Sequence, residues 1–177
     1  MSWLLDSDVL SQPAKKAGDV RVITWIEKHR QQCYTSSIVI AQLAFGVRTK
    51  RGKQRAAMQM WLKQLVEAMH GRILGFNVSV AHVWADLQYQ LQKAGKPMPV
   101  EDSYIAAIAR RHNLTVATGN VKDFQRPGVN DQRHDAPRFA AIASRRHRVA
   151  IAAGHCRHRA GREHRERAVG RRRTVRQ

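Results

Sequence analysis

Up to about residue 130, short apolar runs alternate with stretches whose apolar residues recur every three or four positions. The first run, Trp3-Leu4-Leu5, stops at Asp6 and Asp8, which predicts a short buried strand ending in a turn. Further strands are predicted at 72–76 and 114–118, and 34–37 is predicted as a strand that runs into a helix.

The intervening stretches have the spacing of amphipathic helices. Strands separated by helices favour right-handed crossovers and a mostly parallel sheet covered on both faces. We therefore predict a three-layer α/β/α domain with a sheet of four to five strands, whose ligands bind at the carboxyl ends of the strands. The predicted helices are 20–29, 38–47, 58–69, 80–91 and 101–112.

This pattern ends near residue 130, and the composition changes there. The chain has 177 residues. Its last segment, 131–177, contains 14 Arg, five His and no Lys, whereas 1–130 contain nine Arg and nine Lys. Low hydrophobicity with high charge predicts disorder. We predict a domain at 1–130 and an Arg-rich tail at 131–177, and a reading-frame change near residue 130 is one hypothesis for the switch.

Several classes of protein are excluded or disfavoured by the sequence. No apolar stretch approaches the ~20 residues of a membrane-spanning helix, and the first residues lack the pattern of a secretory signal. A cytoplasmic protein is therefore expected, with Cys33 and Cys156 reduced rather than paired. No phosphate-binding Gly-rich loop or Gly-x-Ser-x-Gly elbow occurs, which disfavours ATP, NAD and serine-hydrolase chemistry.

Five of the nine carboxylates in 1–130 follow predicted strands or open a predicted helix. Carboxylates that converge repel one another unless a cation lies among them, and oxygen ligands favour Mg²⁺ or Mn²⁺ over zinc. The competing interpretation is helix capping or surface charge, and taken residue by residue it is preferred for each of the five, Asp6 and Asp102 included. The five residues are Asp6, Asp8, Glu101, Asp102 and Asp123.

Four segments, taken together and in order, carry a resemblance to a known family. Residues 1–11, 36–47, 102–109 and 115–124 resemble the four successive motifs of PIN-domain toxins, particularly the FitB-like branch of the VapC type. The resemblance covers about 2–130. It implies a Mg²⁺- or Mn²⁺-dependent ribonuclease that cleaves RNA, forms a homodimer, and is silenced by an antitoxin with a DNA-binding domain.

The resemblance also assigns roles to individual residues. Asp6 and Asp102 match metal-binding carboxylates, and Asp123 matches a carboxylate that assists through water. Gln42 stands where the family normally has Glu, and an amide carries no charge and takes up no proton. Further polar side chains expected around this site are Ser7, Thr118 and Asn120.

Two functions remain open from the sequence. The first is a ribonuclease toxin of a type II toxin-antitoxin system. The second is a catalytically impaired PIN domain, a decoy or relic that still dimerises and binds an antitoxin. Gln42 favours the second, as does the departure from the family pattern after Gly128-Val129-Asn130.

Three other patterns have competing interpretations. The basic run 48–55 is interpreted as a solvated loop, with contact to RNA phosphates as the alternative. The faces that carry Trp61 and Trp84 are interpreted as core, with a dimer or antitoxin surface as the alternative. His155, Cys156, His158 and His164 fit no standard zinc spacing and are interpreted as chance composition.

Overall fold

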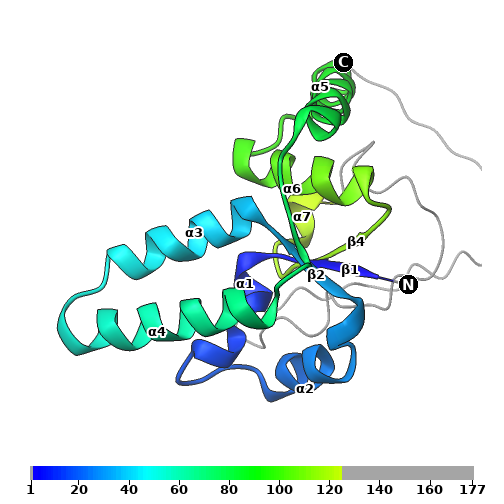
Figure 1. Cartoon of the computed structure of the whole chain (residues 1–177). Coiled ribbons are helices and arrows are strands. Elements are labelled where there is room, and N and C mark those ends of the chain that lie inside the picture. Colours follow the sequence, from blue (N-terminus) through cyan, green and yellow to red (C-terminus); the bar gives the residue numbers. More distant parts are fainter. Residues whose placement is uncertain (1, 125–177) are drawn as a thin grey trace, which may run out of the picture. The chain divides into compact units, whose positions relative to one another are not determined.

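The computed structural model describes residues 2–124. In this part of the chain, four parallel strands form one sheet in the order β3-β2-β1-β4 (Figure 1). The predicted parallel α/β sheet is therefore confirmed. The Arg-rich tail, a fifth strand and the His/Cys group of the tail all lie outside the described residues. The strands are β1 (Trp3–Leu5), β2 (Cys33–Ser36), β3 (Ile73–Leu74) and β4 (Thr115–Ala117).

The helices observed between the strands match the predicted ones closely, with two short additions. Helix α1 follows β1 where we predicted a turn, and α7 follows β4 where we predicted no helix. The α-helices are α1 (Ser7–Leu10), α2 (Val20–Lys28), α3 (Ser37–Arg48), α4 (Gly52–Ala68), α5 (Val78–Lys93), α6 (Val100–Arg111) and α7 (Val121–Phe124), with single 3₁₀ turns η1 (Gln12–Ala14) and η2 (Arg30–Gln32).

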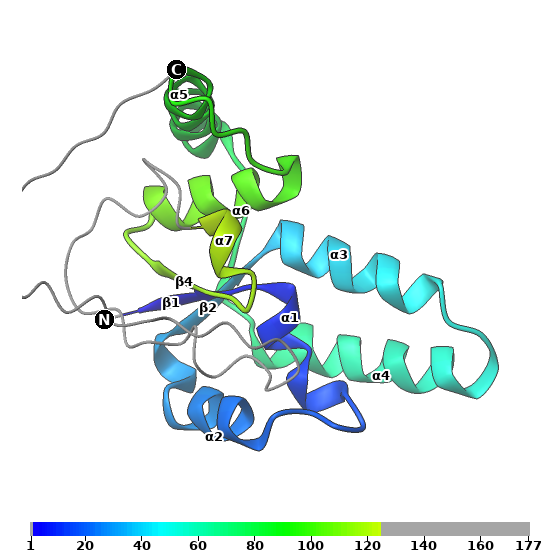
Figure 2. The ribbon, with the colours of Figure 1, turned by 180° about the vertical axis from the view of Figure 1, so that it is seen from behind.

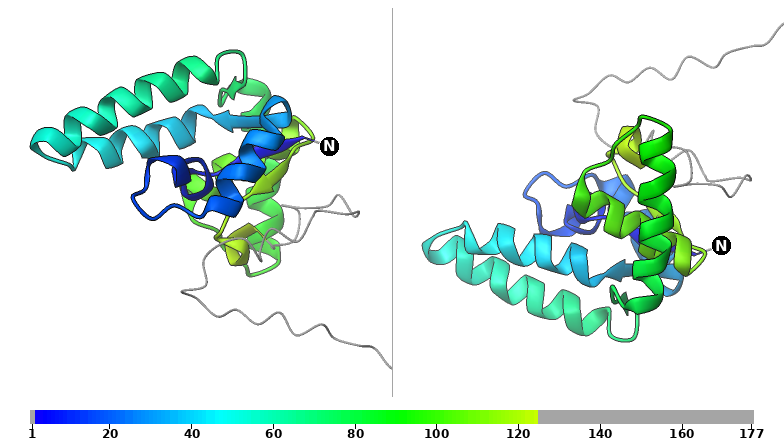
Figure 3. Two further views of the ribbon diagram at one scale, coloured as in Figure 1. Left: turned by 90° about the horizontal axis from the view of Figure 1, so that it is seen from below. Right: turned by 90° about the horizontal axis from the view of Figure 1, so that it is seen from above.

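The helices form a layer on each face of the sheet. Helices α2 and α4 lie on one face, and α5 and α6 lie on the other (Figures 1 and 2). Helices α3 and α4 run side by side as a hairpin that extends away from the strands (Figure 3). The three-layer arrangement predicted from the sequence is therefore confirmed for the described residues.

Strand β1 lies in the middle of the sheet, between β2 and β4. Trp3, Leu4 and Leu5 are all buried, as expected for a parallel strand covered on both faces. Leu5 pairs with Ala117 of β4, and the backbone N–H of Asp6 extends the ladder by donating to the Ala117 carbonyl at 3.0 Å. The first residue after β1 is thereby fixed beside the end of β4.

Helix α6 is buried along most of its length. Its middle, from Ile105 to Ala109, is at most 2% exposed, because the helix packs between α5 and the sheet and also contacts α3. The small side chains of Ala106, Ala107 and Ala109 permit this close approach. The first turn of α6 carries Asp102, so burial of the rest of the helix holds that residue in place.

The basic run was predicted wrongly as a loop. Only 49–51 links α3 to α4, and α4 begins at Gly52 with Lys53 and Arg55 already helical. The prediction of core packing was right for Trp84, which packs against the core cluster. It was wrong for Trp61, which is half-buried and lines surface pockets, because α4 contributes no buried residue.

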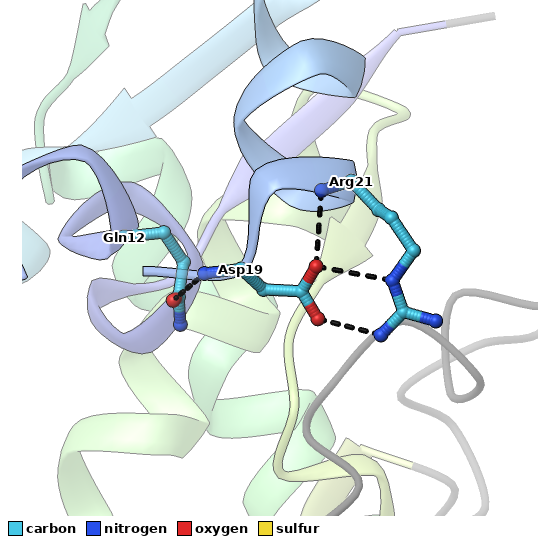
Figure 4. Close-up of polar contacts among 3 residues, drawn as sticks. All are labelled: Gln12, Asp19 and Arg21. Atoms are coloured by element: carbon cyan, nitrogen blue, oxygen red, sulfur yellow. Dashed lines mark hydrogen bonds and ion pairs between the residues drawn. The ribbon is translucent and has the colours of Figure 1, made fainter. Parts of the chain in front are cut away.

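A hydrogen-bonded loop follows α1 and joins it to α2 (Figure 4). Gln12 Oε1 accepts from the backbone N–H of Asp19 at 3.2 Å, and Gln12 Nε2 donates to the Asp8 carbonyl at 2.9 Å. Asp19 caps α2 through the N–H of Arg21 and forms an ion pair with its guanidinium at 2.6 Å, which lowers the pKa of Asp19. This loop therefore fixes the backbone at Asp8.

Within residues 2–124, none of the helices combines the length and the apolar character that crossing a bilayer requires.

Cys33, at the start of β2, has a buried thiol whose reactivity tests the packing of this strand. Burial raises the pKa of its thiol to about 11, and the nearby Arg72 charge offsets part of that rise. In Cys156→Ser protein, where Cys33 is the only cysteine, iodoacetamide at pH 8 should alkylate it on the order of 100-fold more slowly than in urea-unfolded chains. Mass spectrometry of quenched samples measures this rate.

The same thiol sets the sign of a pH effect on stability. The folded state holds the Cys33 proton more tightly than the unfolded state does, because the folded pKa is raised. The free energy of unfolding of this variant should therefore fall as pH rises from the ordinary thiol range toward about 11. Equal alkylation rates in folded and unfolded protein would contradict the buried position of Cys33.

Candidate functional site

The site lies at the carboxyl edge of the sheet, and Asp6 is at its centre. Asp6 follows β1 directly and is only 6% exposed. Its Oδ1 accepts from the backbone N–H of Ser7 at 2.6 Å, and its Oδ2 accepts from the hydroxyl of Thr118 at 2.7 Å. Thr118 follows β4, so the pairing of β1 with β4 brings together two residues that lie far apart in the sequence.

From Thr118 the hydrogen bonds continue to two more carboxylates. The backbone N–H of Asn120 donates to the Thr118 hydroxyl at 3.0 Å. The Asn120 side-chain amide donates to Asp102 Oδ2 at 3.2 Å and to Asp123 Oδ2 at 2.7 Å. Asp6, Asp102 and Asp123 are therefore connected through Thr118 and Asn120, although they come from three different elements.

Asp8 also belongs to this site, although the sequence favoured a cap or a surface charge for it. Its Oδ2 accepts from the backbone N–H of Gly119 at 2.8 Å. Burial, and secondarily the neighbouring Asp6, raise the pKa of Asp8, while its backbone hydrogen bonds act in the opposite direction. The position of Asp8, two residues beyond Asp6 at the sheet edge, was the available signal, but carboxylates in first turns are commonly caps.

A pocket of about 300 Å³ opens beside Asp8, toward the α3–α4 hairpin. Gln42 of α3 lines it together with Asp8 and Ser7, and Lys50 from the hairpin link adds a positive charge. Gln42 Oε1 and Asp8 Oδ1 are both buried, and neither accepts a hydrogen bond. The pocket is lined by Ser7, Asp8, Ser11, Gln42, Leu43, Gly46, Thr49, Lys50, Met58 and Trp61.

The structure therefore places the expected residues in two adjoining groups. Asp6, Thr118, Asn120, Asp102 and Asp123 form the hydrogen-bonded group. Ser7 and Gln42 lie on the pocket side with Asp8. Glu101, in the first turn of α6, is exposed, as the surface-charge interpretation expected.

A model of the PIN domain matches residues 3–129. The chain belongs to the PIN-domain family. This PIN domain is 35% identical over 124 residues to Toxin FitB of Neisseria gonorrhoeae, an alignment that covers 68% of this chain and 89% of the relative. It is 34% identical to VapC ribonuclease Y4jK of Sinorhizobium fredii, covering 72% and 93%. The predicted resemblance is confirmed.

Solved structures agree with this assignment. A crystal structure of FitAcB from Neisseria gonorrhoeae has a TM-score of 0.67 at 33% identity, covering 72% of this chain and 93% of that one. VapBC2 from Rickettsia felis, bound to a DNA fragment from its promoter, has a TM-score of 0.63 at 25% identity, covering 72% and 95%. These relatives are toxins seen in toxin-antitoxin complexes.

PIN-domain ribonucleases generally depend on divalent metal ions, and the side chains of this site have part of the ligand set that such an ion requires. Among the described residues, no three His, Cys, Asp or Glu side chains come together as a metal-binding group. The neutral amide of Asn120 lies between Asp102 and Asp123, and neutral Gln42 lines the pocket with Asp8. The donors are nonetheless all oxygens, and two buried ones accept no hydrogen bond, which suits a hard cation such as Mg²⁺ or Mn²⁺.

Proposed function

We propose that this PIN domain is the ribonuclease toxin of a type II toxin-antitoxin pair and hydrolyses RNA phosphodiesters with Mg²⁺ or Mn²⁺. The observation that carries the proposal is the hydrogen-bonded path from Asp6 through Thr118 and Asn120 to Asp102. It holds charged oxygens from β1 and α6 at one edge of the sheet. The kinship with FitB and VapC toxins supports the same activity.

In this proposal Asp6 and Asp102 would hold the ion, which when bound would activate water and neutralise charge on the phosphate. Thr118 fixes one carboxylate oxygen of Asp6, and the Ser7 amide fixes the other, so Asp6 is already oriented before substrate arrives. Orientation in advance avoids reorganisation during the reaction. These contacts make Thr118 and Ser7 positioning residues.

Asn120 positions the second part of the site. Its amide group donates to both Asp102 and Asp123, which holds the two carboxylates near each other. Asp123 then orients the attacking water and accepts its proton. Loss of the Asn120 amide would let the two carboxylates move apart.

Lys50 gives the pocket a means of attracting RNA. It lines the same pocket as Asp8 and Gln42, and it begins a basic stretch that continues into α4 with Arg51, Lys53 and Arg55. These four side chains project from the hairpin, and all except half-buried Lys50 are exposed. Contacts between them and phosphates would make RNA binding weaken as salt rises.

The partners in this proposal are a second copy of the chain and an antitoxin with a DNA-binding domain. FitAB and VapBC relatives are described as complexes, some of them bound to DNA. A cytoplasmic location is part of this proposal, because both the proposed RNA substrate and the promoter DNA of the proposed antitoxin are found there. Residues 1–130 form the PIN domain in this account, and the Arg-rich segment 131–177 takes no part in the chemistry.

RNA cleavage by this protein should depend on a divalent metal ion. Full-length protein should cleave structured RNA in 5–10 equivalents of Mn²⁺ or in Mg²⁺, on the order of 100-fold faster than in EDTA, because the ion activates water and neutralises the phosphate. Gel analysis of labelled RNA under single-turnover conditions measures the rate. Adding Mn²⁺ back after EDTA should restore it.

The competing function is a catalytically silent PIN domain that only binds partners, and neutral Gln42 is the observation that favours it. Gln42→Glu protein, tested beside the natural chain, separates the two. Cleavage by the natural chain supports the ribonuclease. Cleavage by Gln42→Glu alone would show that this chain is a disabled toxin.

A further inference from the structure

Two buried oxygens in the pocket beside Asp6 lack hydrogen-bond donors. Asp8 Oδ1 and Gln42 Oε1 are screened from solvent, and neither accepts a hydrogen bond of normal geometry from the described part of the chain, although the Val9 backbone N–H interacts with the Asp8 carboxyl group. Buried acceptors without a donor are rare in folded proteins, since each forfeits its interaction with water. Because both residues line one pocket, a single ligand could satisfy both.

The charges around the pocket indicate what that ligand is. Asp8 lies two residues beyond Asp6 at the same edge of the sheet, and it lines the pocket together with Gln42. Neither Asp6 nor Asp8 takes part in an ion pair within residues 2–124. Two lysines lie nearby: Lys15 donates to the Asp8 backbone carbonyl at 3.2 Å and not to its carboxylate, and Lys50 lines the pocket without an ion pair to a carboxylate of the described residues. The pocket therefore holds one anionic and one neutral oxygen that lack donors, a set that suits a hard cation.

Asp8 is held so that one oxygen remains available. Its Oδ2 is fixed by the Gly119 amide at 2.8 Å, and its carbonyl is fixed by Gln12 at 2.9 Å. The free atom is therefore Oδ1, on a residue whose backbone and side chain are both anchored. Gln42 lies across the pocket as a neutral oxygen donor from α3.

We propose that Asp8 supplies the carboxylate that Gln42 lacks, so that Asp6, Asp8 and the Gln42 carbonyl oxygen together bind the divalent cation. This inference rests on the proposed metal-dependent function and assigns the negative charge on the pocket side to α1 instead of α3. A carboxylate at position 8 would explain how the site can bind a metal ion although position 42 is neutral. Asp8 is accordingly a carboxylate ligand beside Asp6 on the pocket side of the site.

The test measures Mn²⁺ binding to the full-length protein without RNA, by electron paramagnetic resonance of free Mn²⁺. Asp8→Asn should weaken binding at least about tenfold, because an amide oxygen replaces a charged ligand. The matched control is Asp86→Asn, which removes an exposed carboxylate on α5 and should leave affinity unchanged. Gln42→Glu in the Asp8→Asn background should return affinity to within about threefold of the natural protein.

The double variant Asp8→Asn with Gln42→Glu tests the role of Asp8 specifically, because it removes the carboxylate at position 8 and adds one at position 42 of the same pocket. A general loss of folding would not be rescued by Gln42→Glu, and the thermal unfolding of each variant in EDTA checks this directly. Asp8→Asn should unfold no lower than the natural protein in EDTA, because it relieves repulsion with Asp6 and an amide oxygen can still accept from Gly119.

The possible outcomes distinguish a failure of the Asp8 ligand role from a failure of the proposed metal-dependent function. If Asp6→Asn weakens Mn²⁺ binding and Asp8→Asn does not, the metal site stands and the role of Asp8 is overturned. If the double variant binds as weakly as Asp8→Asn, the exchange between positions 8 and 42 is overturned. If the natural protein binds no Mn²⁺ at millimolar concentration, the metal-dependent function fails and this inference fails with it.

Discussion

Asp6→Asn should reduce RNA cleavage by at least about 100-fold while leaving the domain folded. The carboxylate is 6% exposed and is held by Ser7 and Thr118, so it cannot be replaced by a neighbouring side chain without movement of β1 or β4. Asn retains an oxygen that can accept from the Ser7 amide. What it removes is the negative charge that binds the cation.

The measurement is the single-turnover cleavage rate at saturating Mn²⁺, with circular dichroism and urea unfolding on the same samples. The free energy of unfolding should change by no more than about 1–2 kcal/mol, because a charge-assisted hydrogen bond to Thr118 becomes a neutral one. Asp86→Asn, an exposed change of the same kind, should cleave normally. Natural rates in Asp6→Asn would remove Asp6 from the reaction.

The sequence predicted the sheet well because parallel central strands have a simple signature. Trp3 to Leu5 is apolar without interruption, and the structure buries all three residues between two neighbouring strands. The same reasoning placed Asp6 at the carboxyl edge of the sheet, and the family resemblance added Thr118, the last residue of the predicted fourth strand. Their 2.7 Å hydrogen bond is the structural result of that shared edge.

The role of Asp8 was not predictable in the same way. Its surroundings depend on the Gly119 amide, which arrives from the end of β4, and on Gln42 across a pocket. Both contacts are tertiary and leave no periodic trace in the sequence. Locally, Asp8 has the appearance of an ordinary first-turn carboxylate, and this is the reason that capping was the preferred interpretation.

Helix α4 shows where periodicity was misleading. Met58, Trp61 and Leu65 recur at helical spacing, which predicted a stripe facing the core. The helix is real, but it packs along α3 in a hairpin extending from the sheet, so its apolar residues are only partly covered (Figure 3). Spacing predicts a helix and its apolar face, and it does not predict how much of that face other elements cover.

The start of α4 was missed because charge was read as a sign of a loop. The residues from Gly52 to Arg55 contain Lys, Gln and Arg, which are good helix formers when exposed. Gly52 has a positive φ of 52°, a backbone conformation that glycine adopts without strain and that begins the helix directly after the link.

Ser103→Ala should lower the free energy of unfolding by about 2 kcal/mol, although it removes a single oxygen atom. Ser103 is fully buried at the junction of α5 and α6. Its hydroxyl accepts from Trp84 Nε1 and from Gln88 Nε2, both at 2.9 Å, and donates to the Val100 carbonyl at 2.6 Å. Alanine leaves two donors of α5 without their acceptor, and this loss exceeds the cost of one average hydrogen bond.

Urea unfolding followed by tryptophan fluorescence measures the effect, and it also reports on the altered surroundings of Trp84. Ser79→Ala removes an exposed hydroxyl of the same helix α5, which donates to Asn77 Oδ1 and accepts from Arg111 Nε of α6. Because both contacts are exposed to water, which can replace the hydroxyl, this change should alter stability by no more than about 0.5 kcal/mol. Equal stabilities of the two variants would show that Ser103 does not join α5 to α6. Because Asp102 precedes Ser103 in the first turn of α6, the folded Ser103→Ala protein should still bind Mn²⁺, which separates the stability of this junction from the chemistry beside it.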